Sequence, residues 1–237
     1  MNPNEACQAC HSCWLCHAAQ SAELLKEAQP QVVEAFDKGK ITRHYPRGAI
    51  LYHQGSLGDA LYCISSGRIK IYQTDAAGMV QILRIIGPGD FLGFRRLLSK
   101  QPSTNTAQVI SPATVCQIPG PTVLAALASD PQIAKNILTA QSKAMERTES
   151  QLLKLVGLSS PARVASLLLE YSQPSPTGAM ASMTREEMAQ LAGTSIESVS
   201  RVVHEMARQG SLRLRGRSIC VLDRPALEEF IAKEYRK

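Results

Sequence analysis

The chain has 237 residues, of which 44% are hydrophobic and 19% are charged. This composition excludes a disordered chain and leaves room for one globular domain with a smaller second one. The longest stretch without a charge, residues 101–129, contains four prolines and cannot be a membrane-spanning helix. Lys and Arg outnumber Asp and Glu by 26 to 20, so the net charge of +6 permits a nucleic-acid partner without requiring one. No basic start precedes an apolar run, so we expect a cytoplasmic protein whose seven cysteines are thiols, metal ligands or redox groups rather than disulfides.

The first twenty residues contain a dense cysteine motif. Cys7, Cys10, Cys13 and Cys16 follow the spacing CxxCxxCxxC. Closed zinc sites usually separate two CxxC pairs by roughly 15 to 20 residues, whereas a cubane iron-sulfur cluster tolerates the denser spacing. The bacterial ferredoxin run ends differently, and a redox dithiol is a third alternative. We therefore predict a metal-binding or redox-active arm over residues 1–20.

Residues 21–129 have the pattern of an antiparallel β structure. Eight glycines lie between Gly48 and Gly93, among short segments rich in Ile, Leu, Tyr and Val. Turns at about ten-residue spacing, with alternation over residues 68–72, predict a small barrel or roll. No nucleophile elbow, Walker loop or carboxylate pair with a base occurs in the chain, so we do not expect an enzyme.

A long helix is predicted over residues 130–157. Asp130 is a suitable N-cap, Pro131 fits the first helical position, and Gly157 ends the helix. One stripe with alternating spacings of 3 and 4, typical of a coiled-coil pair, contains Leu138, Gln141, Met145, Thr148, Leu152 and Leu155. A second stripe, expected to pack on the β roll, contains Ile133, Ile137, Ala140 and Ala144. Two stripes favour a homodimer over a single amphipathic core helix, although the polar seam positions should weaken the association.

Residues 158–237 contain the signals of a helix-turn-helix. Thr184–Glu187 and Thr194–Glu197 both fit capping boxes, and Gly193 lies between them. The apolar residues expected on the inner faces of the two helices are Met188, Ala189, Leu191, Ile196, Val199, Val202, Val203 and Met206.

The second of these helices has a polar face that suits DNA. Glu197, Ser200 and Arg201 stand at positions i, i+3 and i+4 near its start, where a recognition helix enters the major groove. Arg can donate to guanine, Glu can accept from cytosine, and Ser can bond a base edge or a phosphate. A capping role alone would also explain Glu197. A hairpin over residues 212–219 would form a wing with further phosphate-binding candidates, Arg215 and Arg217.

In its order of parts the chain resembles the CRP/FNR family of bacterial transcription regulators over nearly its whole length. Within that family it is similar to the FNR-type, oxygen-sensing members, because Cys7-x2-Cys10-x5-Cys16, the distant Cys116 and the recognition-helix pattern match theirs. The resemblance implies an α+β fold with an N-terminal antiparallel β roll like that of cyclic-nucleotide-binding domains, a long dimerisation helix and a C-terminal winged helix-turn-helix. It also implies RNA polymerase and double-stranded DNA as partners and no membrane.

The resemblance further implies that Cys7, Cys10, Cys16 and Cys116 hold a [4Fe-4S] cluster, which oxygen destroys, weakening the dimer. Cys13 is then an extra thiol or a substitute ligand. We expect Cys116→Ala to abolish the cluster, since no neighbouring thiol is anticipated. Two other cysteines, Cys63 and Cys220, are predicted to be ordinary strand residues.

Three further expectations concern ligands, shielding and DNA. Trp14 and Leu15 should cover the cluster with apolar bulk. A cyclic-nucleotide site in this family needs a Gly-Glu followed by an Arg-Ser or Arg-Thr, whereas this chain has Gly93-Phe94 and residues 103–106 without a charge, so we expect no cyclic nucleotide. The recognition-helix residues imply a palindrome like TTGAT, four bases, then ATCAA.

Overall fold

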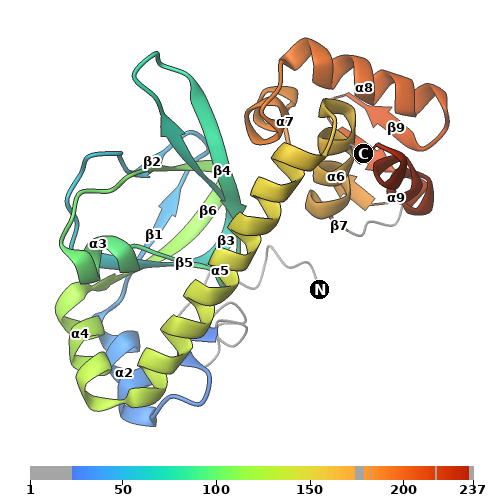
Figure 1. Ribbon diagram of the computed structural model, residues 1–237. Coiled ribbons are helices and arrows are strands. Elements are labelled where there is room, and N and C mark those ends of the chain that lie inside the picture. The colour runs from blue at the N-terminus through green and yellow to red at the C-terminus, as the bar shows by residue number, and fades with distance from the viewer. Residues whose placement is uncertain (1–22, 174–178, 182, 217, 235–237) are drawn as a thin grey trace. The chain divides into compact units, whose positions relative to one another are not determined.

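The computed structural model describes residues 23–173, 179–181, 183–216 and 218–234. Two compact units divide within one long helix, α5 (Pro131–Gly157), with the change between Met145 and Glu146. The N-terminal unit contains a β roll and a helical layer, and the C-terminal unit contains a small helical domain with a sheet (Figure 1).

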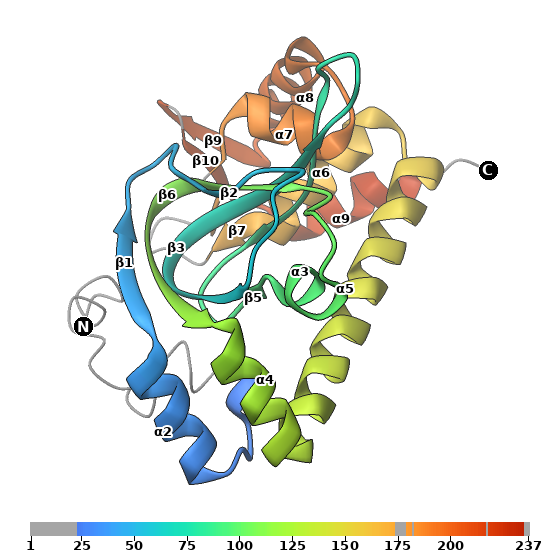
Figure 2. The same ribbon diagram turned by 90° about the vertical axis from the view of Figure 1, so that its left-hand side faces the viewer.

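The β roll of the N-terminal unit is entirely antiparallel. Its central path is β1 (Ile41–Tyr45), β6 (Thr106–Pro119), β3 (Ala60–Thr74) and β4 (Val80–Ile86). Two shorter strands, β2 (Ile50–Tyr52) and β5 (Phe91–Leu92), pair with β6 and β3 respectively. Figure 2 shows the long strands β3 and β6 curving together, and their register shifts three times between Ile64 and Ile69. Gly67 has φ +85°, and a Cβ there would collide with the backbone of Pro112, so only glycine fits this bend.

Alternate residues of β3 and β6 face two different cores. Ile64 and Val115 are register partners whose side chains join the core inside the roll, with Ile69, Ile71 and Val109. Leu61 and Ile118 are also register partners, but their side chains join a second core beneath the helices. Because side chains alternate between the faces of a strand, each strand contributes to both cores.

The helical layer covers this second core. It consists of the 3-10 turn η1 (Glu23–Leu25), α2 (Pro30–Gly39), α4 (Gly120–Ser129) and the first turns of α5, while α3 (Phe94–Ser99) adds Phe94 and Leu97. Ile133 and Ile137 of α5 are buried here, as the second stripe of the sequence predicts. Asp130 caps α5 by accepting the amide of Gln132 at 3.0 Å.

The C-terminal unit is built on α6 (Ser160–Tyr171), α7 (Arg185–Ala192), α8 (Ile196–Arg208) and α9 (Arg224–Lys233). Its antiparallel sheet runs in the order β7 (Ser172–Gln173), β8 (Ala179–Ala181), β10 (Ser218–Val221), β9 (Leu212–Arg215). The β roll, the long helix and the winged helix-turn-helix are therefore present, which confirms the expected fold class.

Candidate DNA interface and sensor site

The first helix of the helix-turn-helix, α7, begins with a complete capping box. Thr184 Oγ1 accepts the amide of Glu187 at 3.1 Å, and Glu187 Oε2 accepts the amide of Thr184 at 2.8 Å. Gly193 ends the helix with φ +58°, a left-handed conformation that glycine adopts without strain. These local signals fix the turn between α7 and α8.

The start of α8 differs from the sequence prediction. The N-cap is Ser195, whose hydroxyl accepts the amide of Ser198 at 3.2 Å, and not Thr194. The amide of Thr194 instead donates to the carbonyl of Ala189, so Thr194 still belongs to the turn that ends α7. The prediction for Ile196 was also wrong, because at one residue past the cap this side chain is 45% exposed.

The inner face of α8 otherwise agrees with the sequence, because Val199, Val202, Val203 and Met206 are buried. On the other side, Glu197 and Arg201 are exposed and Ser200 is half-buried. Hydrogen bonds from the Glu197 backbone N–H and from the Ser195 hydroxyl lower the pKa of the Glu197 carboxyl. Glu197 is therefore a surface anion near neutral pH, and its carboxylate is not committed to the predicted capping box.

The wing forms as expected. Antiparallel β9 and β10 pair Arg215 with Ser218, and Gly216 in the connecting turn has φ +56°. Arg213 and Arg215 are exposed, whereas Arg217 lies outside the described residues. Arg208, at the end of α8, forms an ion pair with Glu205 on the same helix.

Arg163, on α6, holds the helix-turn-helix together and was not identified from the sequence. Its Nε donates to the carbonyl of Ala192 at 2.7 Å and its Nη2 donates to that of Gly193 at 3.3 Å. Its Nη1 also donates to the carbonyl of Leu158 at 2.8 Å, just after the end of α5. One guanidinium thus binds the turn of the motif to the segment between α5 and α6.

The sensor candidate among the described residues is Cys116, on β6. Its side chain is 5% exposed, and its Sγ lies 3.5 Å from Thr42 Oγ1 on β1. On the other side, β3 places Cys63 directly opposite Cys116, and β5 places Phe91 opposite Cys63. Opposed residues share a face of the sheet, and Phe91 packs on the core beneath the helical layer.

This arrangement corrects the expectation that Cys116 has no neighbouring thiol. Cys63 does lie in a strand, as predicted, but that strand is paired with β6 at Cys116 itself. The local pattern around Cys63 contains no signal for this register. Cys220 is buried in β10. The other predicted ligands, Cys7, Cys10, Cys13 and Cys16, lie outside the described residues, as do Trp14 and Leu15.

The segment that follows the cysteine arm is attached to the helical layer. Leu24 is buried in the core, and its carbonyl accepts the side-chain amide of Asn136 on α5 at 2.9 Å. The same Asn136 amide donates to the carbonyl of Lys26 at 2.7 Å. The amide of Gln29 donates to Asp130 Oδ2 at 2.8 Å. Residues 24–29 are therefore tied to the start of α5.

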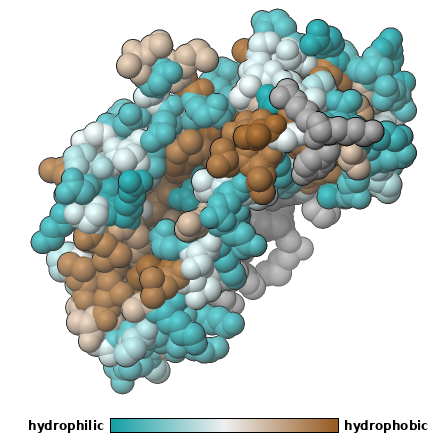
Figure 3. Space-filling view, in the orientation of Figure 1, coloured by the Kyte–Doolittle hydropathy of each residue, from teal (hydrophilic) through white to brown (hydrophobic). Residues whose placement is uncertain are grey.

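The predicted dimerisation seam of α5 is exposed in the single chain. Leu138, Met145 and Leu152 are each more than 60% exposed, Leu155 is 39% exposed, and Thr148 is exposed as well. Leu153 and Val156, which the seam does not include, are similarly exposed. Figure 3 shows the resulting apolar surface, in brown, over the C-terminal turns of α5. An apolar stripe of this kind is typical of an association surface.

Both units match families of known proteins. Residues 42–130 match the cyclic nucleotide-binding domain, and residues 162–230 match the Crp-like helix-turn-helix domain. The CRP-like cAMP-activated global transcriptional regulator of Mycobacterium tuberculosis is 30% identical over 208 residues, which cover 85% of this chain and 93% of that protein. The chain belongs to the CRP/FNR family. It is therefore a DNA-binding transcription regulator rather than an enzyme.

Other members of the CRP/FNR family are also similar. The anaerobic regulatory protein of Pasteurella multocida is 27% identical over 190 residues, which cover 78% of this chain and 69% of that protein. The structure of FixK2 from Bradyrhizobium japonicum superposes with a TM-score of 0.73 at 23% identity, over 80% of this chain and 96% of that one, and shows the shared fold.

The residues at which the sequence was searched for a cyclic-nucleotide site make contacts within the chain. Phe94 is buried in the core beneath the helices, and Ser103 and Thr106 bond the backbone of Asn105 and Gln54. Arg96, which sequence reasoning overlooked, is buried with its guanidinium 4.0 Å from the centre of the Tyr52 ring. Burial raises the pKa of Tyr52.

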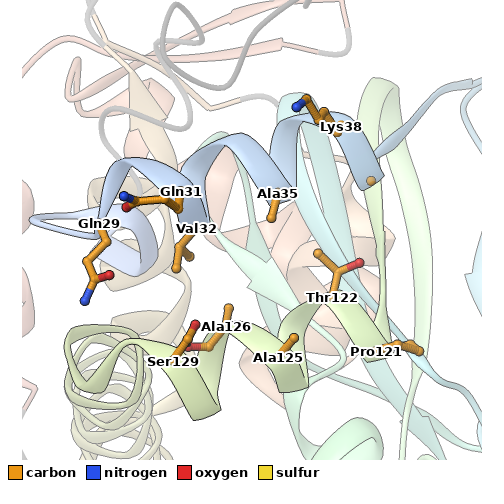
Figure 4. A pocket seen from close by; sticks show the side chains of 11 residues that line it. Gln29, Gln31, Val32, Ala35, Lys38, Pro121, Thr122, Ala125, Ala126 and Ser129 are labelled. Atoms are coloured by element: carbon orange, nitrogen blue, oxygen red, sulfur yellow. The ribbon is translucent and has the colours of Figure 1, made fainter.

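A groove of about 620 Å³ lies between α2 and α4 (Figure 4). Val32, Ala35 and Ala126 line it, and the charged side chain at its edge, Lys38, forms an ion pair with Glu34 at 2.6 Å. Among the residues that the structure describes, no helix is both long and apolar enough to cross a membrane.

Proposed function

We propose that this CRP/FNR protein is an oxygen-responsive, FNR-type regulator that binds a palindromic DNA site as a [4Fe-4S]-bearing homodimer and controls anaerobic gene expression. Cys7, Cys10, Cys16 and Cys116 would hold the cluster, with Cys13 as an extra or substitute thiol. The observation that carries the proposal is that Cys116 stands two residues before Ile118 on β6, and Ile118 shares a core with Leu24, in the segment that follows the cysteine arm. The cluster, when bound, would supply the reactivity toward oxygen.

The residues present fit such a group. Thiolates are the ligands that iron-sulfur clusters use, and Cys116 is a buried thiol on a rigid strand. No group of three or more potential metal ligands occurs among residues 23–173, 179–181, 183–216 and 218–234, so a complete ligand set requires the arm. The name of the similar anaerobic regulatory protein of Pasteurella multocida agrees with this proposal. The alternative is a regulator of the same fold with zinc or a dithiol switch at the arm.

The contacts of Asn136 suggest how the arm influences DNA binding. Asn136 and Asp130 bind residues 24–29 to the start of α5, and the same helix carries the exposed seam further along. If the cluster orders the arm, the contacts of residues 24–29 would also order α5, the helix through which two chains associate. Two linked helix-turn-helix motifs then bind two half-sites together, which increases affinity without any new contact. RNA polymerase is the further partner that we propose.

We also propose that no cyclic nucleotide is the effector. A cyclic phosphate requires a charged partner when it is buried, and the hydroxyls of Ser103 and Thr106 are already bonded within the chain. Arg95 and Arg96 are cations close to these residues, but Arg95 already donates to the Thr104 hydroxyl and the guanidinium of Arg96 stacks on the Tyr52 ring. Equilibrium dialysis with cyclic AMP should give no binding, and binding that disappears in Arg96→Ala would contradict this part of the proposal.

The deciding experiment is purification without oxygen. We expect brown protein with about four iron and four acid-labile sulfide per chain, and zinc at one per chain without sulfide would reject the cluster.

Variants of the cysteines and of Leu15 test the ligands and the shielding. Cys13→Ala should retain the cluster. Cys63 lies opposite Cys116 and would take its place as a ligand in Cys116→Ala. Loss of the cluster should therefore be complete only in the double variant Cys63→Ala/Cys116→Ala. Leu15→Ala, which tests shielding by Trp14 and Leu15, should shorten the lifetime of the cluster in air without lowering its anaerobic yield.

A further inference from the structure

We infer that Cys63 and Cys116 form a dithiol site that a peroxide oxidises to a cross-strand disulfide. The two residues are register partners on neighbouring strands, β3 and β6. They are 6% and 5% exposed, so both thiols are held inside the protein. The family resemblance assigns no role to Cys63, and the proposed function uses Cys63 only as a substitute thiol when Cys116 is replaced.

The geometry of the ladder permits the bond. From Ala60 to Ile64, β3 pairs with β6 without a shift, so the cysteine pair lies in a regular part of the sheet. Directly opposed residues in antiparallel strands have Cα atoms roughly 4.5 to 5.5 Å apart. Disulfides usually span Cα separations of about 4.4 to 6.8 Å. The Cα separation of an opposed pair thus lies within the range that disulfides span, and the bond requires rotation of the two side chains with a small approach of their Cβ atoms.

The surroundings indicate which thiol reacts first. Thr42 Oγ1 on β1 is 3.5 Å from Cys116 Sγ, so a polar side chain borders this thiol. Thr42 is itself exposed on β1, so a small oxidant reaches Cys116 from that side. Cys63 is flanked by Cys116 and Phe91. We assign Cys116 as the attacking thiol and Cys63 as the resolving thiol.

The reaction balances with hydrogen peroxide as the oxidant. The Cys116 thiol gives up its proton as its sulfur attacks one peroxide oxygen, the O–O bond breaks, and the departing hydroxide takes up that proton, so the products are a sulfenic acid on Cys116 and one water. The sulfur of Cys63 then attacks the sulfur of the sulfenic acid, and the displaced hydroxide takes up a proton and leaves as a second water. In total, two thiols and one hydrogen peroxide give one disulfide and two waters.

The disulfide would be incompatible with Cys116 as a cluster ligand, and this consequence alone rests on the proposed function. A thiol released from the cluster would become available to Cys63, and a chain with the disulfide would require reduction before it could bind a cluster again. The chemistry of the pair itself requires no metal.

The test uses the full chain with Cys7, Cys10, Cys13 and Cys16 replaced by Ser. Of the seven cysteines, three then remain: Cys63, Cys116 and Cys220. After treatment with equimolar hydrogen peroxide, we expect peptide mass spectrometry to show Cys63 linked to Cys116, with two hydrogens lost and with recovery by dithiothreitol. Free thiols should decrease from three to one per chain. Cys220→Ser in the same background is the matched control and should form the same cross-link.

Two variants test the assigned order. Cys63→Ser should leave a sulfenic acid on Cys116 that dimedone traps, whereas Cys116→Ser should leave Cys63 largely unmodified. A folded protein in which Cys116 is oxidised to sulfinic acid without a cross-link, or in which neither thiol reacts, would overturn the inference. Iron and sulfide in the unsubstituted chain are measured separately, so a colourless zinc protein that still forms the disulfide would reject the proposed function and retain this inference.

Discussion

The side-chain amide of Asn136 donates a hydrogen bond to the carbonyl oxygen of Leu24 across 2.9 Å, joining residues 112 positions apart. A second bond from the same amide reaches the carbonyl of Lys26. Asn136 is buried on α5, in the helix that also carries the exposed seam. This one side chain therefore connects the segment that follows the cysteine arm with the helix proposed to form the dimer.

Replacing Asn136 by Ala should release residues 24–26 from α5. The buried carbonyl of Leu24 and the part-buried carbonyl of Lys26 would lose their donor, and an unsatisfied buried group costs roughly 1 to 3 kcal/mol. Hydrogen exchange at residues 24–29 should accelerate, and the midpoint of urea unfolding should decrease. Thr139→Ala is the matched control on α5, because the exposed Thr139 hydroxyl donates to the carbonyl of Lys135 on its own helix. Equal exchange in the two variants would show that Asn136 does not anchor this segment.

The two threonines that precede the helices of the DNA-binding motif should behave differently. Thr184→Ala removes one half of a capping box and should cost about 1 kcal/mol, since caps are typically worth 0.5 to 2 kcal/mol. Thr194→Ala should change the free energy of unfolding by less than about 0.5 kcal/mol, because Ser195 caps α8. Urea unfolding of both variants measures the difference. A larger effect at Thr194 would restore the capping box that the sequence predicted.

Sequence reasoning succeeded where the signal is local. The capping box at Thr184, the Asp130–Pro131 start of α5 and the glycine turn of the wing are each specified within four residues, and the structure has all of them. It failed by one residue at Ser195, because Thr194 and Ser195 are both good caps and the αL conformation of Gly193 decides between them.

The relationships that the sequence did not reveal join residues far apart in the chain. The register of Cys63 with Cys116 depends on how β3 and β6 pair, and a single sequence contains no measure of that register. Arg163 donates to carbonyls about 30 residues away in the chain. The residues around it in the sequence do not distinguish it from an arginine that is exposed to solvent. Asn136 is similar, because its partners are backbone atoms that every residue possesses. The four arm cysteines, by contrast, were conspicuous in the sequence.

Arg163→Ala should weaken the DNA-binding unit. Loss of the bonds to Ala192 and Leu158 removes charged donors, each of which contributes roughly 1.5 to 3 kcal/mol when sheltered and less when partly exposed. We expect lower stability of the unit and weaker DNA binding at every sequence. Arg224→Ala provides the control, since its long, exposed contacts with Leu169 and Ser172 should contribute little. If both variants unfold at the same urea concentration, Arg163 does not organise the turn.

Charge placed in the seam of α5 should prevent association. Leu152→Glu introduces a carboxylate into an apolar stripe that we expect a second chain to bury, where an unpaired charge is costly. Sedimentation equilibrium of the anaerobic protein should change from dimer to monomer. Ser150→Glu, on the opposite side of the helix, is the control and should leave the dimer intact. A dimer that persists in Leu152→Glu would place the interface elsewhere.

Arg201 and Arg215 should contribute to DNA binding in different ways. Arg201 is exposed at the start of α8, beside Glu197, whereas Arg215 is exposed on the wing. We expect the dimer to bind a palindrome with the half-sites TTGAT and ATCAA, separated by four bases. In each half-site Arg201 should contact the guanine, Glu197 the cytosine paired with it, and Ser200 should lie near a thymine. Two-fold symmetry of the dimer requires half-sites about one helical turn apart.

Binding of each variant to the palindrome and to a site with the G·C pair swapped separates these roles. Arg201→Ala should cost about 1 to 3 kcal/mol per half-site and relax the choice at the G·C pair. Arg215→Ala should weaken both sites alike and flatten the dependence of affinity on salt, because a phosphate contact releases counterions without reading a base. The measurements use the cluster-bearing dimer at fixed salt. Equal losses on the two sites for Arg201→Ala would mean that Arg201 contacts phosphate and that another residue of α8 selects the base pair.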